Sequence, residues 1–182
     1  MSSDWEQRDF KSFDGTRLSY YDYEDDYEEA GKGGGEEAGH GRAVIILHGL
    51  MSRALDLAGL ARLLRERGMR PIGLDFRAHG SSDAPHDPDA YKKQAIARDV
   101  IALAEHLQLA DYALAAYGLG SEITARVFNL GAPITRAVMC GWGGPPTNQL
   151  DLYASDEWAA QTIRLAEGFE TDDPESITDE QA

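Results

Sequence analysis

The amino-acid sequence predicts an α/β fold in which a mostly parallel sheet is wrapped by helices on both faces. Short, continuous apolar runs of strand type occur at 43–47, 71–74, 112–117 and 136–140. Segments whose apolar residues recur at helical spacing lie between these runs. Regular alternation of strand and helix is typical of a parallel sheet, and ligands of such sheets bind at the carboxyl ends of the strands. We therefore expect a functional site in the loops that follow the strands.

The composition is that of a single globular domain, since 42% of the 182 residues are hydrophobic. The formal net charge of −15 is concentrated in two segments. Residues 22–37 include eight acidic residues and one lysine, and residues 170–180 include six acidic residues and no basic residue. The rest of the chain is nearly neutral, so nucleic acid and anionic membranes are disfavoured as partners. We expect the glycine-rich acidic stretch 24–41 to be a mobile loop.

The location of the protein is predicted from the absence of a long apolar segment in the sequence. The first ten residues are polar and charged, and no stretch approaches the ~20 apolar residues of a membrane span. These features predict a cytoplasmic protein. The single cysteine, Cys140, excludes an internal disulfide, and its position in an apolar run predicts a buried, inert thiol.

The first elements expected along the chain are two antiparallel strands. Apolar runs at 10–13 and 18–23 flank Asp14-Gly15, a common hairpin turn. Two helices are then expected between the apolar strands. The first has its leucines on one side and Gly68 at its C-terminal cap; these leucines are Leu60, Leu63 and Leu64. The second is marked by Ile96, Val100, Leu103 and Leu107.

The strand at 112–117 leads directly into a glycine turn and a helix. The turn is Gly118-Leu119-Gly120, and Ile123 and Val127 then recur at helical spacing. A dinucleotide-binding G-x-G-x-x-G loop is an alternative interpretation, but Ile123 stands in place of the third glycine. Ser121 is the nearest serine, although the small residues that allow a tight turn are centred on Gly118. We therefore predict a sharp strand-to-helix turn at Gly118.

Three motifs in this order resemble the N-terminal portion of the α/β-hydrolase family over residues 10–141. They are His48-Gly49 after the first central strand, Asp-x-Arg-x-His-Gly-x-Ser at 75–82 after the next, and the turn at Gly118. In that family the turn carries a nucleophilic serine in the sequence G-x-S-x-G, and here Gly118 occupies the place of the serine. The resemblance implies a protein related to serine esterases and other acyl hydrolases that is inactive as written.

The resemblance also implies the remaining residues of the site. The main-chain N–H groups of Leu50 and Leu119 would form the oxyanion hole. The neighbouring residues that would line the binding site are His48, Gly49, Met51 and Tyr117. We expect a small apolar or ester-like ligand, no cofactor and no metal. The alternative is a non-catalytic small-molecule-binding or scaffold protein on the same fold.

The other two members of a catalytic triad follow the serine in this family, but all five histidines of this chain precede Gly118. We expect His48 and His79 to brace turns by hydrogen bonding. Residues 1–141 are expected to form the core, and residues 142–182 a helix of lid type and an acidic tail. A helix-capping pattern at 178–181 has no helix after it. We therefore expect a truncated fold, incomplete at the C-terminus, whose open sheet edge is covered by a second chain or a homodimer.

Overall fold

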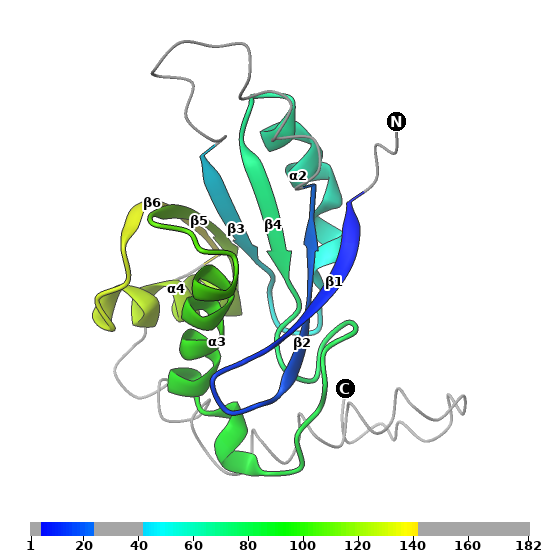
Figure 1. Cartoon of the computed structure of the whole chain (residues 1–182), viewed down its shortest axis with the longest axis vertical. Helices are drawn as coiled ribbons and strands as arrows, with labels where there is room; N and C mark the ends of the chain where they lie inside the picture. Colours follow the sequence, from blue (N-terminus) through cyan, green and yellow to red (C-terminus); the bar gives the residue numbers. More distant parts are fainter. Residues whose placement is uncertain (1–4, 24–41, 142–182) are drawn as a thin grey trace.

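The computed structural model describes residues 5–23 and 42–141 and is built on one six-stranded sheet (Figure 1). The strands are β1 (Glu6–Lys11), β2 (Arg17–Asp22), β3 (Ala43–Leu47), β4 (Arg70–Leu74), β5 (Tyr112–Tyr117) and β6 (Ile134–Cys140). The α-helices are α2 (Ala58–Arg65), α3 (Lys93–His106) and α4 (Leu119–Asn129). Two short 3₁₀ helices, η2 (Ala54–Leu57) and η3 (Pro88–Tyr91), precede α2 and α3.

The sheet has the order β1-β2-β4-β3-β5-β6. Strands β4, β3, β5 and β6 are parallel, whereas the β1–β2 hairpin joins the edge of β4 in antiparallel orientation. The predicted α/β class with a mostly parallel sheet is therefore confirmed. Because the parallel strands end at the same edge, the loops after β3, β4 and β5 lie close together there.

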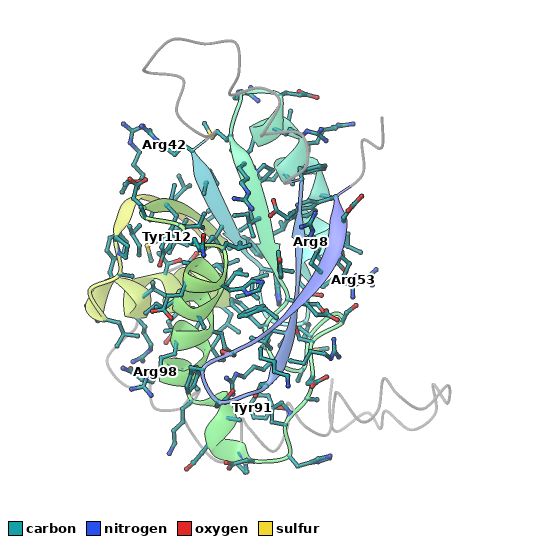
Figure 2. All side chains as sticks on the ribbon, viewed as in Figure 1. Arg8, Arg42, Arg53, Tyr91, Arg98 and Tyr112 are labelled. Atoms are coloured by element: carbon teal, nitrogen blue, oxygen red, sulfur yellow. The ribbon has the colours of Figure 1, made fainter. Side chains whose placement is uncertain are left out.

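Helices cover both faces of the sheet. Helices α3 and α4 pack together on one face and α2 lies on the other (Figure 1). Alternation of side chains along β3 explains the two layers. Ile45 and Leu47 belong to the larger apolar core under α3 and α4, and Ile46 belongs to the smaller core under α2. Side chains fill the space between the sheet and the helices on each side (Figure 2).

Helix α2 buries a small residue, Ala61, between two exposed leucines. Ala61 is fully buried, whereas Leu63 is 45% exposed and Leu60 is also exposed. Only Leu64 of the three leucines packs partly against the smaller core. The three leucines that the sequence grouped on one side of the helix therefore differ in burial, and Ala61 is the fully buried residue of α2.

The cap predicted for this helix is confirmed. Gly68 has a positive φ of 74°. Its N–H donates to the carbonyl oxygen of Arg65, and the N–H of Met69 donates to that of Leu64. This is the Schellman arrangement, in which a left-handed glycine closes a helix.

The prediction of a buried thiol at Cys140 is also wrong, because this cysteine is exposed. β6 is the last strand of the described sheet, and α4 covers only one of its faces. Ala137 packs toward that helix, so the alternating residues Val138 and Cys140 point away from it. Val138 is 62% exposed for the same reason.

Candidate functional site

The turn between β5 and α4 has an unusual backbone conformation. Gly118 has φ 55° and ψ −118°, and α4 begins at the next residue. A residue with a side chain pays about 1–3 kcal/mol in such a sparsely populated region, whereas glycine adopts it freely. A Cβ at this position would lie 3.5 Å from the Cα of Gly49, which is an ordinary contact. The turn therefore has space for a side chain at position 118 and carries none.

The start of α4 lies close against the end of β3. The Gly120 N–H donates to the carbonyl oxygen of His48 at 3.1 Å. A Cβ on Gly120 would lie only 2.4 Å from the carbonyl oxygen of Leu47. The second glycine of the turn is therefore required for this close approach, and it joins the loop after β3 to the loop after β5.

His48 is a structural residue at the head of the loop after β3. Its ring is fully buried, Nδ1–H donates to the carbonyl oxygen of Gly49 at 2.7 Å, and Nε2 accepts the N–H of Phe76 at 3.0 Å. Burial, together with the nearby His79, lowers the pKa of His48 to about 3. Both ring nitrogens are therefore engaged on a neutral imidazole, as the sequence predicted for a residue that braces a turn.

His79 has a similar role in the loop after β4. Its Nδ1–H donates to the carbonyl oxygen of Arg77 at 2.8 Å, and burial lowers its pKa. The two imidazole rings lie 5.1 Å apart. Both ring nitrogens of His48 are bonded, so His48 is not a free proton acceptor for position 118.

The residues after Gly49 form an exposed turn. The Ser52 N–H donates to the carbonyl oxygen of Gly49, so Leu50 and Met51 are the central residues. Met51 has a φ of 59°, and its side chain is 55% exposed. Within residues 5–23 and 42–141, neither the Leu50 amide nor the Leu119 amide donates a hydrogen bond to another residue. Among these residues the two amides therefore have no acceptor, as an oxyanion-binding pair requires.

Tyr117 is held between two glycines beside this turn. Its ring atoms would lie 3.0 Å from a Cβ on Gly49 and 3.2 Å from a Cβ on Gly141. The side chain remains 57% exposed. The tyrosine therefore supplies an aromatic wall next to Gly118, and Gly49 is needed to let that wall approach.

Ser121 does not substitute for the missing nucleophile. It is fully buried, and its Oγ–H donates to the carbonyl oxygen of Cys140 at 2.9 Å. The same carbonyl oxygen accepts the Gly118 N–H at 2.9 Å. Ser121 thus ties α4 and the turn to the end of β6.

Two charged residues of the second motif have roles that sequence reasoning missed. Asp75 is buried and accepts the N–H groups of Ala54 and Ser81. Arg77 is also buried and makes a two-pronged ion pair with Asp99, at 2.6 and 2.7 Å. The signal was present, because charged residues that directly follow a buried strand need partners for their charge.

The remaining residues of the Arg77 cluster come from distant parts of the chain. Arg77 also contacts Asp14 of the β1–β2 turn at 2.7 Å, and Ser12 of the same turn donates to Asp99. Arg53, by contrast, projects outward from the loop after β3 (Figure 2). The cluster therefore fixes the hairpin and α3 to the loop after β4, behind the site.

Comparison with known proteins identifies the family. A profile of the α/β hydrolase fold matches residues 42–172. The chain belongs to the α/β-hydrolase family. It is 30% identical over 146 residues to the AB hydrolase superfamily protein YisY of Bacillus subtilis, a match that covers 79% of this chain and 54% of that protein. A serine hydrolase-like protein of Dictyostelium discoideum is 28% identical over 123 residues, which cover 65% of this chain and 33% of that protein.

Solved structures of α/β hydrolases have the same fold. Epoxide hydrolase VrEH1 from Vigna radiata superposes with a TM-score of 0.65 at 21% identity, covering 79% of this chain and 42% of that chain. An α/β hydrolase from Novosphingobium aromaticivorans superposes with a TM-score of 0.61 at 26% identity, covering 76% and 45%. The chain therefore spans about half, or less, of the length of these relatives.

The structure brings together most of the residues that the sequence predicted for the site. Gly118, Gly49 and Tyr117 lie close to one another. The main-chain carbonyl oxygen of His48 accepts a hydrogen bond from the Gly120 N–H at the start of α4. In the described residues, no three side chains are arranged to hold a metal ion, and no helix is long and apolar enough to cross a membrane. The acidic loop 24–41 and the segment 142–182, with its expected lid-type helix, lie outside the described residues.

Proposed function

We propose that this chain forms the oxyanion-binding half of an α/β-hydrolase site for a small apolar or ester-like molecule, without the group that attacks it. The observation that carries the proposal is the backbone of Gly118. Its φ of 55° and ψ of −118° are those of a strained strand-to-helix turn, yet no side chain is present. A strained turn with a glycine at its apex suits a site that has lost its nucleophile and kept its shape.

The chemistry of acyl transfer explains why such a site would bind without reacting. A serine attacks the acyl carbon, a histidine takes the serine proton, and backbone N–H groups stabilise the negative oxygen that forms. Gly118 has no hydroxyl, and His48 is neutral with both ring nitrogens bonded. The amides of Leu50 and Leu119 belong to the main chain, so they do not depend on the residue at position 118.

The side chains around the turn favour an apolar ligand with one polar oxygen. Leu50, Met51 and Tyr117 are all substantially exposed, and they lie within two residues of the Leu50 or Leu119 amide in the sequence. An ester or a carboxylate could place an oxygen at the amides and its apolar part against these side chains. This arrangement supports the non-catalytic alternative equally, in which the same surface binds a small molecule without chemistry.

The test is to restore the hydroxyl in the Gly118→Ser variant. The matched control is Gly131→Ser, which places serine at another glycine of positive φ, 77°, where a Cβ meets no atom within 4 Å. Both variants are incubated with p-nitrophenyl acetate. In Gly118→Ser the serine oxygen bonds to the acetyl carbon, p-nitrophenolate leaves, and the serine proton passes to water. Intact-mass and peptide analysis then locate the acetyl group.

We expect acetylation at position 118 that is faster than at position 131, because only the former serine lies beside the free amides. The unsubstituted chain should remain unlabelled at this turn. Equal acetylation rates in two folded variants would count against the proposal. Saturable binding of phenylphosphonate by the unsubstituted chain would favour the binding role, whatever the outcome for the serine variant.

We also propose that the open edge of the sheet at β6 is a contact surface for a second chain, a copy of this one or another. β6 is the last strand of the described sheet, and Val138 and Cys140 are exposed on it. Analytical ultracentrifugation of the chain and of Val138→Lys tests the homodimer. A dimer that the lysine disrupts supports it, and a monomer at high concentration in both proteins contradicts it.

A further inference from the structure

The loop that carries the Leu50 amide is held at both ends by two consecutive residues that follow β4. At its start, the Phe76 N–H donates to His48 Nε2 at 3.0 Å. At its end, the Ala54 N–H donates to Asp75 Oδ1 at 2.7 Å. Strands β3 and β4 are parallel neighbours with their last residues paired, so the two loops leave the sheet side by side.

The loop needs this support because Met51 has a conformation that a side-chain-bearing residue rarely adopts. Its φ of 59° lies in the left-handed region. Such residues persist only where the surrounding structure holds them in place. Asp56, in η2 directly after the loop, accepts both the Ser52 hydroxyl and the Arg53 N–H, which holds the second half of the loop against the start of η2. Among the described residues, the hydrogen bonds between this loop and the residues after β4 lie at its two ends.

Asp75 is enclosed so that its carboxylate has one orientation. Oδ1 accepts from Ala54, and Oδ2 accepts the Ser81 N–H at 2.9 Å. Gly80, at φ 55°, passes so close that a Cβ there would lie 2.0 Å from Oδ2. A carboxylate offers two acceptor oxygens, whereas an amide of the same shape offers one acceptor and one donor group. Asparagine at this position must therefore break one of the two contacts.

We propose that Asp75 is a positioning residue for the Leu50 amide: it holds Ala54, and through Ala54 it fixes the turn that presents this amide to a ligand. The consequence for ligand binding rests on the proposed function. The consequence for the turn does not, since it concerns the ligand-free chain. The motif at 75–82 thus acts on the site by holding the loop that follows His48-Gly49.

The test compares Asp75→Asn with the unsubstituted chain by ¹H–¹⁵N NMR. Asp83→Asn is the matched control, because it makes the same substitution in the same loop at an exposed carboxylate that pairs with Arg17. We expect the Leu50 and Met51 amide signals to shift and to exchange faster with solvent in Asp75→Asn only. The affinity of the Leu50 amide for phenylphosphonate, followed by titration, should fall by about ten-fold or more.

A second measurement uses the unsubstituted chain and does not depend on the variant folding. As the pH is lowered, the carboxyl carbon of Asp75 and the amide nitrogens of Ala54 and Leu50 should titrate with a shared midpoint. The titratable and charged groups that act on this carboxyl are His79, Arg53 and Tyr21. The ring signals of His79 are recorded in the same series to separate its protonation from that of Asp75.

Each outcome decides the proposal. The positioning role would be overturned if the Leu50 amide signal changed neither in Asp75→Asn nor during the titration of Asp75. Equal phenylphosphonate affinity in parent and variant, with binding present, would also overturn it and would leave the proposed function standing. If phenylphosphonate shifts neither amide in the unsubstituted chain, the proposed function loses its anion site, and the ligand-free signals alone decide the role of Asp75.

Discussion

Acid should destabilise this protein through His48. In the folded chain the imidazole is buried, and its pKa is lowered from 6.5 to about 3, chiefly by burial and then by His79. In the unfolded chain it titrates at its ordinary value. Between these two pKa values the unfolded state binds a proton that the folded state does not, so the free energy of unfolding falls as the pH is lowered.

The size of this effect follows from the two pKa values. At pH 8 both states are neutral at this residue, and the contribution of His48 is fully present. At pH 5 the unfolded imidazole is protonated and the folded one is not, which removes about 2 kcal/mol from the free energy of unfolding. Carboxylates whose pKa is lowered in the fold, such as Asp14 and Asp56, lose their contribution only below about pH 4. Burial raises the pKa of Asp75 and Asp99, so protonation of these carboxyls acts on the free energy of unfolding in the opposite sense, and the comparison with His48→Gln separates the histidine from them.

The assay is urea unfolding at pH 8, 7, 6 and 5 for the parent chain, His48→Gln and His106→Gln. Glutamine can accept the Phe76 N–H through its side-chain oxygen but does not titrate. We expect His48→Gln to lose about 2 kcal/mol less than the parent between pH 8 and pH 5. His106→Gln makes the same substitution at an exposed residue of α3 and controls for the change of residue type. Equal pH dependence in the parent and in His48→Gln would refute the reasoning.

Three further predictions concern the framework around the site, each measured by urea unfolding at pH 7. Asp99→Asn should lower the free energy of unfolding by about 3–5 kcal/mol, because it leaves the buried Arg77 guanidinium without its two-pronged partner; a loss below about 1 kcal/mol would contradict this. Gly120→Ala should cost about 1–3 kcal/mol, since its Cβ would lie 2.4 Å from the Leu47 carbonyl oxygen, and an unchanged midpoint would show that α4 can move away. Gly59→Ala is the contrasting case: it lies within α2, its Cβ meets no atom within 4 Å, and it should stabilise the chain by roughly 0.5–1 kcal/mol, an expectation that any destabilisation would refute.

Much of the fold could be predicted because it depends on local patterns. The apolar runs predicted β3, β4 and β5, and the spacing of Ile96, Val100 and Leu103 predicted α3, in which all three are buried. Element boundaries were less accurate, since β6 begins at Ile134, two residues before the predicted strand. Side-chain period and glycine position are read directly from neighbouring residues, so they do not require knowledge of the fold.

Exposure could not be predicted in the same way. Cys140 and Val138 lie in an apolar run that resembles a buried strand, yet both are exposed, because β6 is the last strand of the described sheet and no helix within residues 42–141 covers one of its faces. Leu60 and Leu63 are exposed, whereas Ala61 and Leu64 of the same helix pack against the smaller core. In both places the outcome depended on which element packs opposite, and no local pattern contains that information.

The sequence by itself determined the family motifs, the order of strands and helices, and the absence of a reactive side chain at Gly118. Only the tertiary structure decided how the loops meet. The bond from Ala54 to Asp75 joins residues 21 positions apart, and that from Phe76 to His48 joins residues 28 positions apart. Such bonds form because parallel pairing of β3 and β4 brings two loops to one edge of the sheet, and that pairing is a property of the folded chain as a whole.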